Sequence, residues 1–313
     1  MTTNSFYQTM KDGTELHVMR WIPDGEIKGV VQLCHGMSEH ALRYDKMGSV
    51  FAEAGWVLSA HDQRGHGKTA QKAESLGSGK FGYLADKDGF DAVTEDLLEL
   101  VLGLKADFPQ KKCFLAGHSF GSIVSQNFIE KYGDELDGVV LCGTTGPRQA
   151  LMRAAKLVFG LNALLLGKKH RSKLDANLAF FGYNSRVPKP RKSDFAWLSK
   201  NDFNVQMYEA DQWCGILPTA EFFLEIVRGL YKVHQPKAMK KIPKELPVYF
   251  IYGSDDPVGG YGKTIKKLAA IYKANGMASV QEKVWPGDRH EIFNELDGEA
   301  VMADVIAWLE KQA

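Results

Sequence analysis

The sequence is poor in cysteine and lacks the paired spacing that redox and metal sites use. Its four cysteines are Cys34, Cys113, Cys142 and Cys214, and none forms a C-x-x-C pair. Three of them lie in apolar runs, where a free thiol behaves as a small hydrophobic side chain. A disulfide-stapled secreted scaffold is therefore excluded, and we expect a reducing, cytoplasmic location.

The chain also lacks a large net charge, which is +1 over 313 residues, so composition gives no reason to expect a nucleic-acid partner. The N-terminus has no basic segment followed by an apolar stretch, and we expect no signal peptide. No run reaches about 18 uninterrupted apolar residues, which predicts no membrane-spanning helix. Because 44% of the residues are hydrophobic, the chain can form one large core with a smaller inserted module.

Signatures of nucleotide and metal binding are missing as well. The segments 65–67 and 117–121 match neither G-x-G-x-x-G nor a Walker sequence. Several potential ligands lie near one another in the sequence: His35, His40, His61, Asp62 and His66. Their spacing fits no known ligand set, and there is no H-E-x-x-H helix. We therefore expect neither a cofactor nor a metal.

What the chain does contain is an alternation of apolar strands and helical patterns. Residues 5–10 and 14–21 flank a Lys-Asp-Gly turn and predict a hairpin at a sheet edge. Further strands are predicted at 28–34, 56–60, 113–116, 137–142, 246–253 and 279–285. Helices are predicted at 42–54, 88–106, 121–132, 261–275 and 298–311, and a Gly/Ser-rich loop at 74–82. This order predicts a mostly parallel sheet covered on both faces, with reactive groups at the carboxyl ends of its strands.

The alternation stops near residue 146 and resumes near residue 246. We therefore predict a core formed by residues 1–145 and 244–313, and a helical lid formed by residues 146–243. The lid has 17 Lys and Arg against 7 Asp and Glu, which gives it a net charge of +10 and leaves −9 on the rest. Within it, 220–232 and the apolar stretch 151–166 have helical patterns. The latter has three interpretations, with the main core as the default and a substrate tunnel or a lipid surface as alternatives.

A G-x-S-x-G motif, Gly117-His118-Ser119-Phe120-Gly121, lies between a predicted strand and a predicted helix. In that setting the motif predicts a tight turn that holds a serine hydroxyl out over the sheet. A plain Gly/Ser connection is the alternative, and the flanking elements make it the weaker one. We predict Ser119 as a nucleophile, with the Phe120 N–H and an N–H from the loop after strand 28–34, chosen as Met37, as the oxyanion donors.

A serine nucleophile needs a base, and the base needs an orienting carboxylate. In this topology the order is serine, acid, histidine. His290 is the one histidine beyond residue 234, and it follows the last predicted strand. Asp255 and Asp256 both follow the strand 246–253, and the residues alone do not choose between them as the acid. The other aspartate would serve a turn before Pro257.

Five segments together resemble the monoacylglycerol lipase and lysophospholipase branch of the α/β-hydrolases. They are His35–His40 with Arg43-Tyr44, Asp62–Gly67, Gly117–Gly121, Gly253–Asp256 and Gly287–Glu291. The resemblance runs from about residue 10 to 310 and implies an α/β-hydrolase fold, with Asp256 as the acid. It also implies hydrolysis of monoacylglycerol-like or lysophospholipid esters. Ser38 departs from the pattern, since many members have glycine or alanine there.

The main hypothesis is therefore a serine ester hydrolase that works through an acyl-enzyme on a single-chain lipid or another small ester. The same triad would also serve a small-ester esterase, a thioesterase, an acyltransferase or a peptidase. A non-catalytic binding protein is the hypothesis from another class, and the complete Ser–Asp–His set argues against it. Peripheral membrane contact through the lid is a further hypothesis, motivated by the apolar stretch 151–166 and its basic flanks.

Overall fold

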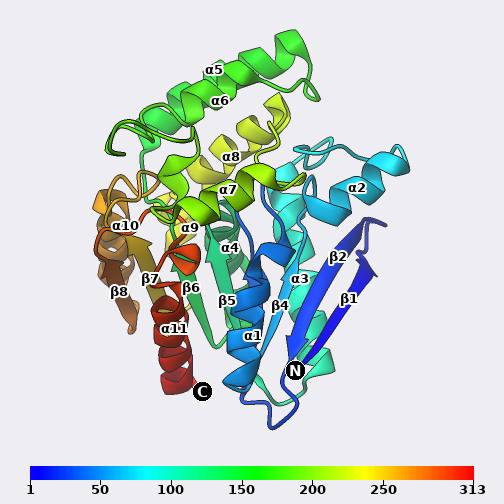
Figure 1. Cartoon of the computed structure of the whole chain (residues 1–313), viewed down its shortest axis with the longest axis vertical. Helices are drawn as coiled ribbons and strands as arrows, with labels where there is room; N and C mark the ends of the chain where they lie inside the picture. The colour runs from blue at the N-terminus through cyan, green and yellow to red at the C-terminus, as the bar shows by residue number, and fades with distance from the viewer.

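The alternating apolar runs form one sheet of eight strands in a computed structural model that describes residues 1–313 (Figure 1). The strands are β1 (Thr2–Thr9), β2 (Glu15–Ile22), β3 (Gly29–Cys34), β4 (Trp56–His61), β5 (Lys112–His118), β6 (Gly138–Cys142), β7 (Val248–Gly253) and β8 (Val280–Trp285). Their order across the sheet is β1-β2-β4-β3-β5-β6-β7-β8. Each strand expected from the sequence is present.

The sheet is parallel from β4 to β8 and antiparallel only where β1 and β2 join it. The expected hairpin is therefore confirmed, and β1 lies at the sheet edge. Every residue of β3, β4, β6 and β7 is buried, as expected for strands covered on both faces.

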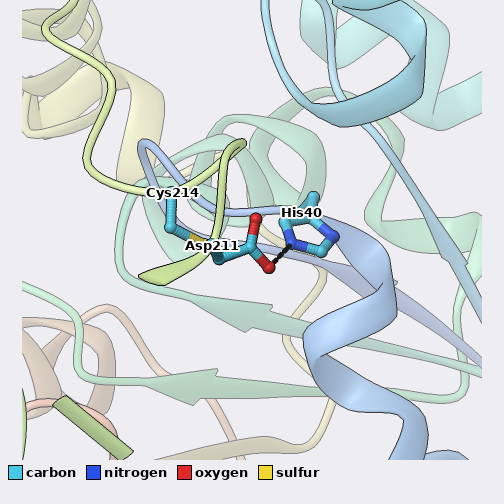
Figure 2. A group of neighbouring side chains, drawn as sticks. All are labelled: His40, Asp211 and Cys214. Atoms are coloured by element: carbon cyan, nitrogen blue, oxygen red, sulfur yellow. Dashed lines mark hydrogen bonds and ion pairs between the residues drawn. The ribbon is translucent and has the colours of Figure 1, made fainter. Parts of the chain in front are cut away.

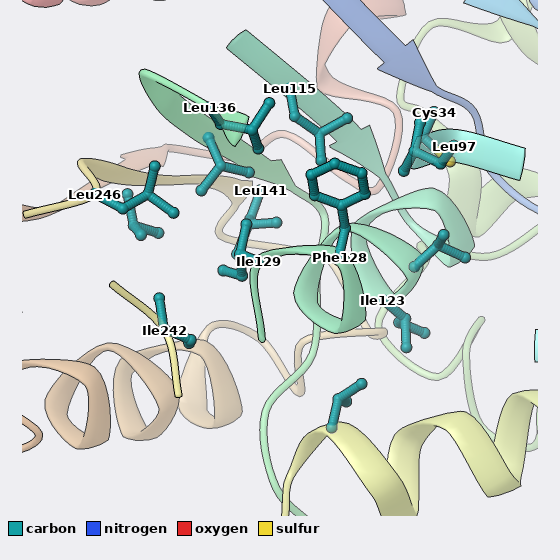
Figure 3. Packing of buried hydrophobic residues seen from close by; sticks show 14 of the residues in the cluster. Cys34, Leu97, Leu115, Ile123, Phe128, Ile129, Leu136, Leu141, Ile242 and Leu246 are labelled. Carbon is teal, nitrogen blue, oxygen red and sulfur yellow. The ribbon is translucent and has the colours of Figure 1, made fainter. Parts of the chain in front are cut away.

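Helices cover both faces of this sheet. The helices of the chain are α1 (Asp45–Glu53), α2 (Gly67–Ser75), α3 (Gly89–Asp107), α4 (Phe120–Tyr132), α5 (Gln149–Leu166), α6 (Lys173–Ala179), α7 (Asp202–Ala210), α8 (Ala220–Val233), α9 (Pro236–Met239), α10 (Lys263–Ala274) and α11 (Gly298–Gln312). Short 3₁₀ turns occur at Ala41–Tyr44, Gly133–Glu135, Ala196–Leu198 and Ile292–Asn294. Helices α3, α4 and α10 share one core cluster with the sheet, and α1 and α11 share the other. Figure 3 shows part of the first cluster, with Phe128 and Ile129 of α4 packed toward the strands that carry Leu115 and Leu141.

Some helices differ from the expectation. The predicted helix 42–54 is a 3₁₀ turn followed by α1, and α2, α6, α7 and α9 were not predicted. Helix α2 buries only Gly67, Thr69 and Ala70, so it has no apolar stripe for periodicity to detect. Contacts with the rest of the fold, rather than a hydrophobic pattern in its own sequence, therefore stabilise α2.

The segment between β6 and β7 contains α5 to α9, and α5 lies at the outer end of the molecule (Figure 1). The default interpretation of 151–166 as part of the main core is wrong, because α5 buries only Phe159, Asn162 and Ala163. Phe159 and Ala163 pack on α8 in a small separate cluster of six buried residues. The division into a core and a lid of residues 146–243 stays a prediction.

Helix α5 is the one helix that is long and apolar enough to cross a membrane, judged by length and composition, with 17% of its 18 residues buried. This helix is not an uninterrupted apolar run, because Arg153 and Lys156 lie within it. The sequence therefore predicted no membrane-spanning helix here. One such helix is weak evidence for a membrane span. Its packing on α8 marks it as part of the helical insert.

All four cysteines are free and buried. Burial raises the pKa of the Cys34, Cys113 and Cys142 thiols above the ordinary value, because the thiolate loses its hydration. Burial also raises the pKa of Cys214. These thiols are therefore held in the neutral form.

Candidate active site

Ser119 lies in the turn between β5 and α4 with φ 53° and ψ −118°, which is a strained conformation for a residue with a side chain. Close packing on both sides of the turn requires glycine. A Cβ atom on Gly121 would lie 2.0 Å from the Cys34 carbonyl oxygen, and one on Gly117 would lie 2.3 Å from Ser125 Oγ. The G-x-S-x-G spacing thus brings β5, α4 and the end of β3 together around one serine.

His290 and Asp256 meet at the same end of the sheet. His290 Nδ1 lies 3.0 Å from Asp256 Oδ2, and both side chains are almost fully buried. The other oxygen of Asp256 accepts a hydrogen bond of 2.8 Å from the Val258 N–H. Asp255 is exposed, and its carboxylate accepts from Ser254 Oγ at 3.3 Å. The structure therefore places Asp256 beside His290 and leaves Asp255 outside the site.

The second ring nitrogen of His290, Nε2, is buried and has no hydrogen-bond partner. Buried polar atoms are rarely left without a partner, and those that are call for an explanation. His290 and Ser119 line the same cavity. A free, buried imidazole nitrogen in a cavity that also holds a strained serine is what a general base requires.

Met37 and Phe120 also line this cavity. Phe120 is the first residue of α4, so its N–H has no carbonyl one turn earlier within the helix. Met37 follows the carboxyl end of β3, and its N–H donates to no group of the protein. Two backbone donors without a partner in the fold therefore belong to residues that line the cavity of Ser119, one from α4 and one from the loop after β3.

A buried ionic network that no sequence motif pointed to lies directly beside these residues. Arg43 donates to Glu39 at 2.8 Å and, with both terminal nitrogens, to Glu291 at 2.7 and 2.8 Å. His118 Nδ1 lies 3.1 Å from Glu39 Oε1, which also accepts from the Tyr44 hydroxyl at 2.9 Å. The signal that could have revealed the network was the Glu39–Arg43 spacing of four residues.

Burial and pairing set the charges in this network. Burial opposes the charged forms, but the hydrogen bond from His118 and the nearby Arg43 hold the pKa of Glu39 well below its usual range. Burial likewise opposes protonation of His118, yet its bond to Glu39 raises the pKa of His118. The Arg43 guanidinium lowers the pKa of Glu291 against the effect of burial. Two carboxylates are thus kept ionised next to the catalytic candidates.

The cavity has a volume of about 970 Å³ and extends from Ser119 under the helical insert. Most of its lining residues are apolar, and α5, α6 and α8 contribute part of this lining, with residues such as Met152, Leu178 and Phe223. Glu39, His118 and Glu291 contribute polar groups near the serine. A hollow of about 840 Å³ at residues 189–194 is far more open and contains none of the candidate residues.

The remaining histidines occupy different environments. Burial lowers the pKa of His35 and His61 to about 4 and that of His66 to about 3, so all three are neutral at pH 7. His40 lies apart from them, with its Nε2 2.8 Å from Asp211 Oδ2. Figure 2 shows this pair beside Cys214, and the potential ligand atoms of the three residues lie within 4.8 Å of one another.

Comparison with known proteins places this geometry in a family. Residues 25–297 match the model of the family described as serine aminopeptidase, S33. The chain is 30% identical to the monoglyceride lipase of Mus musculus, over 95% of this chain and 88% of that protein. It is 29% identical to the monoacylglycerol lipase of Mycolicibacterium smegmatis, over 92% of this chain and 90% of that protein.

Among solved structures, a thermostable carboxyl esterase from Bacillus coagulans, in complex with glycerol, superposes with a TM-score of 0.88. It is 28% identical, and the match covers 99% of both chains. The strand order, the G-x-S-x-G turn and these relatives agree with the resemblance seen in the sequence. The chain belongs to the serine aminopeptidase, S33, family and has the α/β-hydrolase fold.

Proposed function

We propose that this chain is a carboxylic ester hydrolase that cleaves monoacylglycerol-like or lysophospholipid esters through an acyl-enzyme. Ser119 Oγ attacks the ester carbonyl, and His290 Nε2 takes the serine proton. Asp256 accepts from His290 Nδ1 and so holds the ring with Nε2 free. The proton then passes to the leaving alcohol, and water attacks the acyl-serine with His290 again as the base.

The oxyanion formed in each step is assigned to the Met37 and Phe120 N–H groups. Fixed donors of this kind stabilise charge that develops in the transition state, and losing one typically costs about 10²–10³ in rate. Both residues line the cavity that holds Ser119, and this supports the assignment. The observation that carries the proposal is the buried His290 Nε2 without a partner, in the cavity of Ser119.

The substrate class follows from the cavity. An apolar volume of about 970 Å³ suits one acyl chain, while the polar groups near Ser119 suit a hydroxylated head group. The mouse and mycobacterial relatives are named as lipases of monoacylglycerols, and the Bacillus esterase structure contains glycerol. We therefore rank monoacylglycerols above lysophospholipids and short esters.

Peptide hydrolysis is the alternative that the family description raises. An aminopeptidase needs an unpaired carboxylate to hold the substrate's N-terminal amine. Three acidic residues line the cavity, and two of them, Glu39 and Glu291, already pair with Arg43. The third, Asp194, is exposed. The pairing of the two buried carboxylates supports a neutral ester over a cationic peptide. Thioester cleavage and acyl transfer use the same triad and are compared in the same assay.

The test is labelling with a fluorophosphonate followed by mass mapping of the modified peptide. We expect the adduct on Ser119 and its loss in His290→Ala, with Ser254→Ala as a control that keeps it. Hydrolysis is then measured on monoacylglycerols, lysophospholipids, short esters, acyl thioesters and aminoacyl amides, with added alcohol as an acyl acceptor. Ester hydrolysis that persists in Ser119→Ala would exclude the proposed nucleophile.

We also propose that the chain works in the cytoplasm and contacts membranes through α5. Its outward leucines are highly exposed, with Leu164 at 80% and Leu165 at 71%. Lysines and arginines follow directly, in the segment 168–173. Such a helix can lie in the interface of an anionic membrane.

Co-sedimentation with liposomes of anionic and neutral lipid tests the contact. The double variant Leu164→Ser, Leu165→Ser is expected to bind anionic liposomes more weakly than the wild type. Leu102→Ser removes an exposed leucine from α3 on the core and is the matched control. Equal binding of all three proteins would contradict contact through α5.

A further inference from the structure

We propose that Ser38 is a positioning residue that ties the oxyanion loop to the helical insert and so sets the Met37 N–H for catalysis. The oxyanion loop is residues 35–40, and the strap is residues 208–216, which are the end of α7 and the turn after it. The inference rests on the proposed function for the role of Met37. The contact between loop and strap stands on the structure alone.

Ser38 makes three of the hydrogen bonds between the two segments. Its hydroxyl donates to the Ile216 carbonyl at 2.8 Å. Its own carbonyl accepts from the Gly215 N–H at 3.0 Å and from the Tyr208 hydroxyl at 3.0 Å. The hydroxyl and the carbonyl of Ser38 are therefore both bonded to the strap.

The loop is fixed from its other side by Glu39. The Glu39 carboxylate accepts from the Gly36 N–H at 2.5 Å, within the loop itself. The same carboxylate is held by Arg43, Tyr44 and His118. Met37 thus lies between an anchor to the core at Gly36 and an anchor to the insert at Ser38. Its N–H direction depends on both.

The backbone of Ser38 has a conformation that is unusual for a residue with a side chain. Ser38 has φ 55°, the left-handed region that glycine adopts most easily. Glycine would occupy this position without strain, but it would lack the hydroxyl that binds Ile216. A serine in this backbone conformation is strained relative to glycine. The hydrogen bond from its hydroxyl to the Ile216 carbonyl compensates for that strain.

The His40–Asp211 pair adds a fourth bond between loop and strap, at 2.8 Å (Figure 2). A histidine, an aspartate and a cysteine are ligands that zinc accepts. Here, however, His40 Nε2 is already bonded to Asp211, whose second oxygen accepts from the Trp213 N–H at 2.8 Å. Burial and the Asp211 carboxylate also raise the pKa of the Cys214 thiol. The cluster is better explained as part of the loop–strap contact than as a metal site.

The experiment compares the wild type with Ser38→Ala, Ser38→Gly and the control Gln212→Ala, whose side chain is exposed on the strap. Values of kcat and KM are measured with a short soluble ester, together with the rate of fluorophosphonate labelling. Amide hydrogen exchange is followed by mass spectrometry in peptides that cover 35–44 and 206–217. The exchange measurement does not depend on activity.

We expect both Ser38 variants to lose about tenfold in kcat and in labelling rate, with KM within about twofold, since the loss falls on the transition state. Exchange should become faster in both segments, and Gln212→Ala should match the wild type. A kcat within about twofold of the wild type in Ser38→Ala, or full kcat in Ser38→Gly, would overturn the proposal. Unchanged amide exchange in the loop of the Ser38 variants would also overturn the proposal. This outcome is independent of the proposed function, because exchange can be measured even if the wild type does not hydrolyse esters.

Discussion

The Nδ1 atom of His290 lies 3.0 Å from Oδ2 of Asp256, while the neighbouring carboxylate of Asp255 points into solvent. Two adjacent aspartates thus have different environments because the chain turns sharply after β7. The Asp256 carboxylate can fix the tautomer of the imidazole and stabilise its protonated form, and the Asp255 carboxylate can do neither.

Asp256→Asn should therefore lower kcat for ester hydrolysis by about 10³–10⁴, because an amide favours the wrong tautomer of His290. Asp255→Asn changes the same chemical group one residue away and should stay within about threefold of the wild type. Steady-state kinetics on one soluble ester measure both. Equal losses in the two variants would show that the turn, and not the carboxylate beside His290, matters.

Arg43→Met should lower the free energy of unfolding by about 3–5 kcal/mol, since it leaves the buried carboxylates of Glu39 and Glu291 without their cation. Lys46→Met removes a cation from an exposed pair with Glu299, and should leave stability close to that of the wild type because solvent screens such a pair. Urea denaturation at pH 7 compares them. A small effect of Arg43→Met would mean that water or a proton replaces the lost charge.

Glu130→Gln should make the protein more stable, increasingly so as the pH rises. Burial raises the pKa of Glu130 to about 9, and one of its oxygens has no partner. The folded state then keeps a proton that the unfolded state loses above about pH 4.5, so this carboxyl costs stability from there up to about pH 9. Glutamine is neutral throughout and removes that cost.

Thermal melts of Glu130→Gln and the wild type between pH 5 and 9 test this expectation. The difference in free energy should grow with pH and reach an order of 1–3 kcal/mol near pH 8. Glu245→Gln, at an exposed position, is the control and should show no such trend. A difference that does not vary with pH would mean that Glu130 is ionised in the folded state.

Gly121→Ala should abolish fluorophosphonate labelling and lower stability by about 3 kcal/mol or more, because the new methyl group would lie 2.0 Å from the Cys34 carbonyl oxygen. Gly25→Ala is the matched control, since no atom lies within 4 Å of the Cβ position there. Labelling yield and a melting curve distinguish the two. A stable, labelled Gly121→Ala protein would show that the turn can widen without loss of the nucleophile.

Much of the fold could be predicted because its interior strands are short apolar runs and its long helices bury an apolar stripe. The helices α2, α6, α7 and α9 were not predicted because they are short and bury few residues. Helix α5 was assigned to the main core by default, but the sheet faces are already covered by other helices. Its apolar side chains face the cavity and solvent instead.

The candidate site was predictable where the motif fixes local geometry, as at Ser119 and Phe120. The residues alone do not choose between Asp255 and Asp256, since the choice depends on the direction of the turn after β7, and it was the family resemblance that implied Asp256. The bond between Ser38 and Ile216 joins residues 178 positions apart, and no local pattern encodes such a contact. Sequence reasoning therefore found the reacting groups more readily than the contacts that hold them in place.

The burial of all four cysteines has a practical consequence for studying the insert. Thiol reagents need an accessible thiolate, and none of the native side chains offers one. A cysteine introduced at the exposed Leu164 of α5 would therefore be the single reactive thiol of the folded chain. One fluorophore or spin label attached there would report whether the surroundings of the outer helix change when an acyl chain is added, with the native sequence otherwise intact.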